Sequence, residues 1–335
     1  MTKKTEQNAI VLSSRVRLAR NLSHLPFPNQ MTAEQAEEVI RRAKDAAGSR
    51  LSCLPFNTLP DLEKQALMEE HLASPVLLQK KTPCALLLSD DRTVSVMVNE
   101  EDHFRIQSIV PGLDLQEAYR KADETDDLLE SKLNFAFDEE TGYLTACPTN
   151  VGTGMRASVM LHLPAMTANH QINGLIASVG KSGFAVRGMY GEGSQAEGDL
   201  YQISNQITLG ITEQETLCRL QSVTEQIIER ELELRRAMTE QNRAELYDMV
   251  WRAYGAVSYA QIMSTKEFMT LASRLRMGVS MGMLPQVTPE LLNRLITEVQ
   301  PASLQKRCGK ALSAAERDLE RANLLRNTFQ KGKGE

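Results

Sequence analysis

The 335 residues are enough for two domains of ordinary size, or for one large domain with an appendage. Because 43 acidic residues outnumber 38 lysines and arginines, the net charge of −5 offers no general attraction to nucleic acid or to an anionic membrane, and any anion site must be local. Five widely spaced cysteines without a Cys-x-x-Cys pair, and no apolar run near ~18 residues, predict a cytoplasmic protein without a membrane span, disulfide scaffold or zinc site.

The first part of the chain alternates between helical and strand-like patterns. Residues 31–50 predict a helix, because Thr32 is a capping residue and Gly48 marks an end. In residues 83–109 the turn sequence SDDR is followed by TVSVMVN, whose alternating apolar residues are typical of a β-hairpin, and HFRIQSIV alternates as well. A second helix is expected around residues 114–134.

Further strand-like segments follow this helix. They are YLTACPT, RASVMLHLPAM, GFAVRGMYGEGS and YQISNQITLG, and glycine-bearing loops connect them. Groups of short strands with helices between them favour an α+β fold over the strict alternation of a doubly wound sheet.

The character of the chain changes after Gly210. Residues 212–250 predict a long helix in which Leu220, Ile227 and Leu234 recur every seven residues, an apolar stripe that needs a partner. The partner is either a second copy of the chain in a dimer or another element of the same chain. Residues 236–335 lack strand-like alternation and predict a helical second domain.

Two arginines near the start of the chain are candidates for binding an anion. Arg15 and Arg17 lie two residues apart in SSRVRLAR, so on a strand both guanidinium groups point to the same face and can converge on one ligand. A solvated edge strand is the alternative interpretation.

The segment NEEDHFRIQ concentrates charge directly after an apolar strand. Like charges on Glu100, Glu101 and Asp102 raise one another's pKa unless a cation such as Arg105 or a cationic substrate lies near. The segment is therefore a candidate for a general base, with an exposed turn as the alternative.

Two glycine-bearing segments complete the set of candidates. In CPTNVGTGMRAS, Cys147 and two glycines precede an arginine and the helix-like run ASVMLHL, so backbone N–H groups are candidates for cradling phosphate oxygens. Cys147 itself is either a buried apolar side chain or an activated thiolate. In RGMYGEGS, Arg187 and Glu192 bracket a loop able to close over a ligand. The segment from Gly174 to Ser182 misses the P-loop spacing and is interpreted as a helix end.

These motifs, in this order, resemble the catalytic domain of the phosphagen (guanidino) kinases over residues 10–234. Those kinases have a helical domain ahead of the first arginine motif, whereas Arg15 stands almost at the start of this sequence, and they lack a helical domain like residues 236–335. Both departures, together with the RDxxRA-type segment RDLERA, resemble the McsB-type bacterial protein arginine kinases. The resemblance implies an antiparallel sheet flanked by helices in a catalytic domain at 1–235, and an all-α dimerisation and regulatory domain at 236–335.

The resemblance also implies a set of site residues. Catalytic roles fall to Glu101, Glu192 and Cys147, and no protein ligand is implied for the Mg²⁺ that accompanies ATP, because phosphates and water hold it. Five arginines are expected to clamp the ATP phosphates. The full set expected at the nucleotide is Ser13, Ser14, Arg15, Val16, Arg17, His71, Arg105, Arg156, Ala157, Ser158, Val159, Met160, Arg187, Gly188, Met189, Tyr190 and Gly191.

The implied reaction sets a physical problem at the acceptor. A guanidinium has a pKa above about 12.5 and a free glutamate about 4.3, so Glu101 cannot deprotonate the acceptor beforehand. We expect Glu101 to fix the planar cation through two hydrogen bonds and to receive its proton as the N–P bond forms. Glu192 is expected at the second edge of the guanidinium, and the thiolate of Cys147 would contribute charge.

The segment RDLERA lies in a helical pattern, so Arg317 and Arg321 share a face and are expected to grip one phosphoryl group. A solvated helix face is the ordinary alternative. The resemblance implies an allosteric phosphoarginine site at Arg317, Asp318, Arg321 and Ala322.

A catalytic domain without the preceding helical domain is expected to leave its acceptor pocket open to arginines in polypeptides. The resemblance implies protein substrates marked for Clp-dependent degradation in a stress response, a homodimer or larger assembly, and as partners the activator McsA, the repressor CtsR and the ClpC–ClpP machinery. Two alternatives remain: a small-guanidino phosphagen kinase, and a non-catalytic phosphoarginine-binding adaptor.

Overall fold

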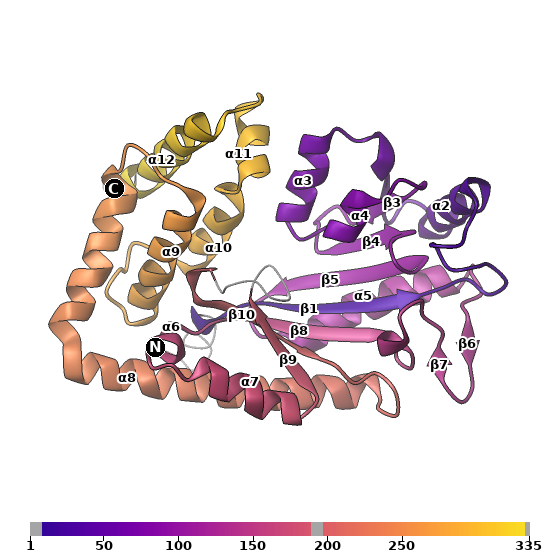
Figure 1. Ribbon diagram of the computed structural model, residues 1–335, viewed down its shortest axis with the longest axis horizontal. Coiled ribbons are helices and arrows are strands. Elements are labelled where there is room, and N and C mark those ends of the chain that lie inside the picture. Colours follow the sequence, from indigo (N-terminus) through magenta and orange to yellow (C-terminus); the bar gives the residue numbers. More distant parts are fainter. Residues whose placement is uncertain (1–8, 189–196, 332–335) are drawn as a thin grey trace.

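The computed structural model describes residues 9–188 and 197–331, and its centre is an eight-stranded sheet in which every neighbouring pair is antiparallel (Figure 1). The strand order is β2-β3-β4-β5-β1-β8-β10-β9. The strands are β1 (Val11–Arg20), β2 (Ser52–Pro55), β3 (Ala85–Leu88), β4 (Val94–Val98), β5 (Phe104–Pro111), β8 (Met155–His162), β9 (Phe184–Gly188) and β10 (Leu200–Asn205), and β6 (Phe137–Asp138) pairs with β7 (Gly142–Tyr143) in a separate hairpin.

Helices surround this sheet and then continue alone to the end of the chain. They are α2 (Ala33–Ala47), α3 (Asp61–Glu69), α4 (Pro75–Gln79), α5 (Leu115–Glu130), α6 (Pro164–Ala168), α7 (Ile172–Lys181), α8 (Glu213–Tyr259), α9 (Thr265–Ser280), α10 (Pro289–Glu298), α11 (Pro301–Cys308) and α12 (Ala314–Lys331). The predicted α+β class, with an antiparallel sheet and a helical C-terminal part, is confirmed. None of the described helices is long and apolar enough to cross a membrane.

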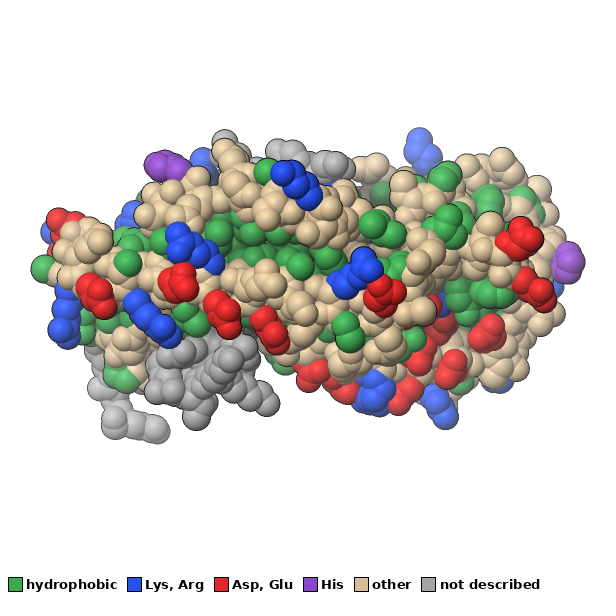
Figure 2. Space-filling model, turned by 90° about the horizontal axis from the view of Figure 1, so that it is seen from below, with side chains coloured by type: hydrophobic (Ala, Val, Ile, Leu, Met, Phe, Trp, Pro, Cys, Tyr) green, Lys and Arg blue, Asp and Glu red, His purple; other side chains and the backbone are tan. Residues whose placement is uncertain are grey.

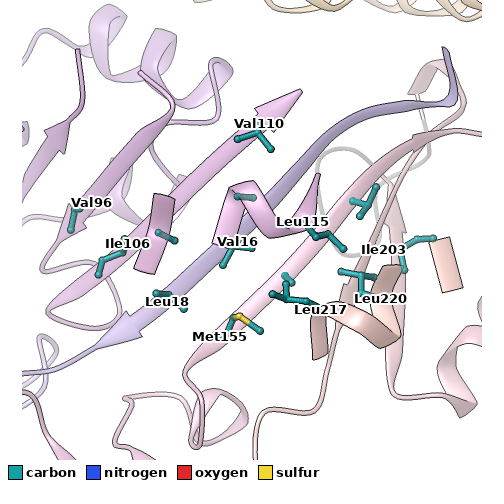
Figure 3. Packing of buried hydrophobic residues seen from close by; sticks show 14 of the residues in the cluster. Val16, Leu18, Val96, Ile106, Val110, Leu115, Met155, Ile203, Leu217 and Leu220 are labelled. Atoms are coloured by element: carbon teal, nitrogen blue, oxygen red, sulfur yellow. The ribbon is translucent and has the colours of Figure 1, made fainter. Parts of the chain in front are cut away.

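One face of the sheet carries the main hydrophobic core. Val16 and Leu18 of β1 pack there with apolar residues of α5 and α8, such as Leu115 and Leu220 (Figure 3). Successive side chains of a strand point to opposite faces of the sheet. Because Val16 and Leu18 face the core, Arg15 and Arg17 face the other side. Burial of the apolar side chains of a central strand therefore places its alternating polar side chains on the opposite face of the sheet.

The helix α8 is the longest element, and its heptad stripe is buried within the chain. It spans 47 residues with a break in helical geometry at Asn242. Leu220, Ile227 and Leu234 are all buried in the main core, so packing within one chain accounts for the stripe and the stripe gives no argument for a dimer. Exposed parts of α8 carry ion pairs such as Arg219–Glu215, and acidic and basic side chains are interspersed on the molecular face seen from below (Figure 2).

A second hydrophobic cluster belongs to the helical part of the chain. It joins the second half of α8 to α9, α10, α11 and α12 through residues such as Val250, Phe268 and Leu325. In Figure 1, α11 lies across from α3, and the two helices are in contact. The C-terminal helices therefore pack as one group against the end of the sheet and against α3.

Two local expectations are corrected. Most of YLTACPT forms a loop, with only Tyr143 in the short strand β7 and a 3-10 turn at Pro148–Asn150. Of the two interpretations given for RASVMLHLPAM, the strand is confirmed and the helix-like run is wrong, because residues 157–162 lie in β8. The reason is its position between β1 and β10, where it is paired on both sides. There is consequently no helix N-terminus after Gly154 to cradle a phosphate.

Candidate active site

Five arginines from four strands line one cavity of about 440 Å³ on the face of the sheet opposite the main core. Arg15 and Arg17 come from β1, Arg105 from β5, Arg156 from β8 and Arg187 from β9. These are the five arginines that the sequence predicts at the nucleotide, and the fold brings all of them together. Residues more than 170 positions apart thus meet because their strands are close in the sheet.

The strand register places like charges against each other. Arg17 of β1 lies directly opposite Arg156 of β8, and like charges directly opposite are destabilising in a sheet. Burial and the charges of Arg105 and Arg156 lower the pKa of Arg15 to about 10. Burial, with Arg105 and Arg15 as further causes, also lowers the pKa of Arg17 well below its ordinary value. This cationic cluster is stabilised by any anion that enters.

The guanidinium of Arg17 carries the sharpest sign of a missing ligand. Its Nε is buried and has no hydrogen-bond partner among the described residues. A buried donor without an acceptor costs about 1–3 kcal/mol. An oxyanion in the cavity would both accept this hydrogen bond and neutralise the surrounding charge.

Arg105 is held in place by a carboxylate that the sequence analysis did not single out. Its Nη1 donates to Oε1 and Oε2 of Glu100 at 2.7 and 2.8 Å, and the hydroxyl of Ser74 donates to the same Glu100. Burial alone would raise the pKa of Glu100, but the ion pair with Arg105 and these hydrogen bonds hold it below the ordinary value. Glu100 therefore orients Arg105 as a fixed anion.

The next two carboxylates of the segment have different environments. Glu101 is exposed, and burial of part of its carboxyl, followed by the charges of Asp102 and Glu100, raises its pKa. Asp102 is buried, and its Oδ1 accepts hydrogen bonds from Asn21 Nδ2 and from the Ala146 backbone N–H, both at 2.7 Å. Of the three, Glu101 is the carboxylate that is accessible to an acceptor, while Asp102 ties the 146–147 segment beside it.

Cys147 lies on that tied segment and is half-buried. Its Sγ lies 3.0 Å from the hydroxyl of Thr149, and its backbone carbonyl accepts from the hydroxyl of Thr145 at 2.8 Å. Gly152, with φ +113, lies so close to the Thr208 backbone that a Cβ would stand 2.1 Å from the carbonyl oxygen. The loop that carries Cys147 is therefore closely packed.

His71 borders both this cavity and a second one. Its backbone has φ +61, and its carbonyl accepts from Gln107 Nε2 at 2.7 Å. Burial and the charge of Arg15 lower the pKa of His71 to about 4, so its ring is neutral at pH 7. An uncharged, flat ring beside the arginines is suited to contact with a nucleotide base.

A second cavity has a volume of about 290 Å³. Among the other residues expected at the nucleotide, those that alternate along β1 and β8 face either this cavity or the core. Ser13, Ser158 and Met160 line the cavity, together with apolar residues of β5. The side chains of four other residues expected at the nucleotide lie on the core side and line neither cavity, and their role at the nucleotide stays a prediction. They are Ser14, whose hydroxyl is bonded to Gly112 O and Asp114 N, and the core residues Val16, Ala157 and Val159.

The predicted loop after β9 is only partly described. Gly188 ends β9 and is buried. Met189, Tyr190, Gly191 and Glu192 lie outside the described residues.

The RDLERA segment is in α12, and its two arginines differ. Arg317 is half-buried, and its Nη1 donates to Leu312 O at 3.1 Å. Arg321 is 1% exposed and donates to Val299 O, Met263 O and Asp318 Oδ1 at 2.8, 2.7 and 2.6 Å. Nε and Nη1 of Arg321 are thus engaged inside the protein, and Arg317 is the more accessible of the two; the expectation that both arginines grip one phosphoryl group stays a prediction. Ala322 is buried as well.

The helical part of the chain also reaches the main cavity. Ile296 and Thr297 of α10, and Gln300 just after it, form part of the lining. Sequence reasoning missed these three residues because nothing in their local pattern differs from an ordinary amphipathic helix.

Two family models match the chain. Residues 31–234 match the ATP:guanido phosphotransferase, C-terminal catalytic domain, and residues 243–335 match the protein-arginine kinase McsB C-terminal domain. Among curated proteins, the protein-arginine kinase of Caldanaerobacter subterraneus subsp. tengcongensis is 49% identical over 329 residues, covering 96% of this chain and 97% of its own. That of Halothermothrix orenii is 46% identical over 321 residues, covering 95% and 92%.

Solved structures show the likeness of fold. Lombricine kinase superposes with a TM-score of 0.62 at 23% identity, covering 71% of this chain and 70% of its own. The duplicated taurocyamine kinase from Schistosoma mansoni with bound transition-state analogue components gives 0.62 at 23% identity, covering 80% and 40%.

Proposed function

Because this chain belongs to the protein-arginine kinase family, we propose that it transfers the γ-phosphoryl group of ATP to the guanidinium of arginine residues in other proteins. The observation that carries the chemistry is the cavity lined by five arginines, one of which has a buried donor without an acceptor among the described residues. Phosphoryl transfer depends mainly on alignment and charge stabilisation, and a converging set of arginines supplies both.

We place the triphosphate of ATP among Arg15, Arg17, Arg105, Arg156 and Arg187 in the larger cavity. The base then lies toward His71 and the more apolar second cavity, which Ser13, Ser158 and Met160 line. Magnesium enters as part of the substrate, held by phosphate oxygens and water. In the described lining of the larger cavity the one carboxylate is Glu69, whose oxygens are engaged by backbone N–H groups, so no side chain is assigned to the ion.

The acceptor guanidinium is placed against Glu101. Its accessible carboxylate can take two N–H bonds from the planar cation and receive a proton as the N–P bond forms. A raised pKa suits Glu101 to that role, because it narrows the gap to the guanidinium. Cys147 stands on the tied loop beside it and would add a negative charge as its thiolate, while Glu192 is proposed for the second edge of the acceptor.

We propose a catalytic domain at 1–235 and a helical dimerisation and regulatory domain at 236–335. In the regulatory part, Arg317 and Asp318 remain candidates for binding phosphoarginine, with Arg321 as the support that orients Asp318 through their 2.6 Å ion pair. Arg321 also donates to Val299 O at the end of α10, beside the cavity-lining Thr297. This contact gives a physical route by which a ligand at α12 would bias the nucleotide site.

The cellular role is proposed from the family resemblance. Phosphorylated proteins would be marked for Clp-dependent degradation in a stress response, with McsA as activator, CtsR as a regulated repressor and ClpC–ClpP as the degrading machinery. The enzyme would act in the cytoplasm as a homodimer or a larger assembly.

The acceptor class is tested by incubating the protein and ATP with either free arginine or an unfolded arginine-containing protein. Acid-labile phosphate is then mapped by mass spectrometry. We expect phosphorylation of the polypeptide, and abolition of turnover by Glu101→Ala. Preferential phosphorylation of free arginine would assign the chain to the small-guanidino kinases instead. Full turnover by Glu101→Ala would remove Glu101 from the mechanism, and an inactive wild-type protein that binds phosphoarginine would favour the adaptor.

A further inference from the structure

A carboxylate on α3 connects the nucleotide cavity to the C-terminal helices. Glu69 is the last residue of α3 and lines the cavity two residues before His71. Its Oε1 accepts from the Ala302 N–H at 2.9 Å, and its Oε2 accepts from the Ser303 N–H and hydroxyl at 2.7 and 2.8 Å. Glu69 therefore occupies the N-terminus of α11, more than 230 positions along the chain.

Helix α11 depends on this distant residue for its N-terminal cap. Its own N-cap residue, Gln300, makes no side-chain cap hydrogen bond; the side-chain amide of Gln300 is turned back to α10, where Nε2 donates to Ile296 O at 2.9 Å. The first N–H groups of a helix need acceptors, and an acidic group there also interacts favourably with the helix dipole. Glu69 meets both needs from across the junction.

The residues next to this contact form one wall of the cavity. Thr297 in the last turn of α10 and Gln300 at the N-cap of α11 both line the same cavity as the arginines. Thr297 also lines the more apolar second cavity. The hydrogen bonds of Glu69 join α3 to α11 and thereby determine the position of this wall relative to His71.

We propose that Glu69 is a positioning residue for the nucleotide site: by holding α11 against α3 it keeps Thr297 and Gln300 in place, so that the C-terminal helices complete the binding site for the nucleotide. This inference rests on the proposed kinase function. It adds that ATP affinity depends on the docking of the helical part, a dependence that the arginines alone do not create.

The experiment measures the KM for ATP, the KM for an unfolded arginine-containing protein, and kcat, in the full-length chain. For Glu69→Ala we expect the KM for ATP to rise roughly five- to twentyfold, as for a lost charge-assisted contact, with kcat and the acceptor KM changed less than about twofold. Glu69→Gln keeps a side-chain acceptor oxygen and should fall between this variant and wild type.

A second variant separates positioning from direct contact with the ligand. Ser303 does not line the described cavity, so Ser303→Ala acts only through the contact with Glu69, and we expect it to raise the KM for ATP about two- to threefold. The matched control is Glu63→Ala, which removes a peripheral 3.9 Å pair with Lys306 across the same junction and should leave all three constants unchanged.

The outcomes distinguish the two proposals. If Glu69 acted only as a negative charge near the phosphates, its removal would lower the KM for ATP; an unchanged or lowered value in a variant with wild-type melting temperature overturns the positioning role. If Glu69→Ala fails to fold, an unchanged KM in Ser303→Ala overturns it as well. A wild-type protein that transfers no phosphoryl group would instead contradict the proposed function.

Discussion

Two regions of the molecule bury arginines, and they do so in opposite ways. Arg17, on the sheet, lies among other arginines, and its Nε has no partner in the described residues. Arg321, in α12, is 1% exposed, whereas Arg17 is half-buried as a residue, and Arg321 donates to two backbone carbonyls and to Asp318. Both belong to arginine-rich sequence motifs, and only the structure separates them.

The difference lies in which interactions the folded chain supplies. A buried guanidinium is tolerated when acceptors surround its donors, and it is costly when they do not. Arg321 has its acceptors within the protein and so contributes to holding α12 against the neighbouring segments. Arg17 lacks one among the described residues, and the missing acceptor is what an anionic substrate would bring. Burial alone therefore does not indicate a binding site; the unpaired Nε of Arg17 does so because it coincides with a cavity and with neighbouring cations.

The largest effect expected from this comparison is on catalysis. Arg17→Ala should lower kcat/KM by about 10³-fold, because a single well-placed arginine has about that worth in phosphoryl transfer. The free energy of unfolding without nucleotide should stay the same or rise, since the variant relieves repulsion from Arg15 and Arg156. Steady-state kinetics and urea denaturation measure the two quantities. The control is Arg92→Ala, at an exposed pair with Glu70; a similar loss there would show that the effect is not specific to the cavity.

The reverse outcome is expected in α12. Arg321→Met should lower the free energy of unfolding by about 3–5 kcal/mol, because it leaves Asp318 and two carbonyls without their donor. Urea unfolding monitored by circular dichroism gives the value. A loss below about 1 kcal/mol would mean that water replaces the guanidinium easily, and Arg321 would then again be a candidate for direct ligand binding.

A pH dependence extends the comparison to two histidines. Burial lowers the folded-state pKa of His71 and of His103 to about 4 each. The unfolded chain therefore binds more protons as pH falls from about 6.5 toward 4, so stability present at pH 7 is lost through that window. Burial is the cause for His103, and its geometry agrees, because Nδ1 accepts from the Leu22 N–H at 2.9 Å and cannot do so once protonated.

When the pH is lowered from 7 to 5, each of these histidines should decrease the free energy of unfolding by about 1.5–2 kcal/mol. The measurement compares urea unfolding of wild type with that of His71→Gln and His103→Gln at both pH values, so that other titrating groups cancel. Bound ATP should reduce the His71 share, because phosphates offset the charge of Arg15 that helps to lower its pKa. ATP should not change the loss of unfolding free energy that His103 causes between pH 7 and pH 5. If ATP changed the losses caused by His71 and His103 equally, the nucleotide would lie away from His71.

The sequence predicts what depends on local pattern. Alternation in β1 indicates that Arg15 and Arg17 share a face, and the same parity rule, applied to β8, is sufficient to separate Ser158 from Ala157 and Val159. The cap predicted at Thr32 is likewise confirmed, and the structure adds a capping box with Gln35. These features follow from the period of the strand or from the chemistry of a helix end.

What the sequence could not give depends on distant packing. Glu100 became a partner of Arg105 because their side chains meet at the start of β5, whereas three adjacent carboxylates look alike in a sequence. The contact of Glu69 with α11 joins residues more than 230 positions apart. The heptad stripe of α8 allowed two interpretations, because the sequence of an apolar helix face does not show whether it packs within the chain or against a second copy.

The smallest effect on the free energy of unfolding is expected at Arg317, which lies in the same motif as Arg321. Arg317 is half-buried, and its side chain donates a hydrogen bond to Leu312 O, so Arg317→Ala should change the free energy of unfolding by at most about 1 kcal/mol. If Arg317 and Asp318 bind phosphoarginine, the variant should keep the basal KM for ATP but lose any stimulation by added phosphoarginine. Nucleotide titration and kinase assays with and without phosphoarginine measure this. Loss of nucleotide binding in the variant would show that the two sites are not separate, and retained stimulation would place the phosphoryl group elsewhere. Because Nε and Nη1 of Arg321 already have acceptors inside the fold, Arg317 is the more accessible guanidinium of this motif for a ligand.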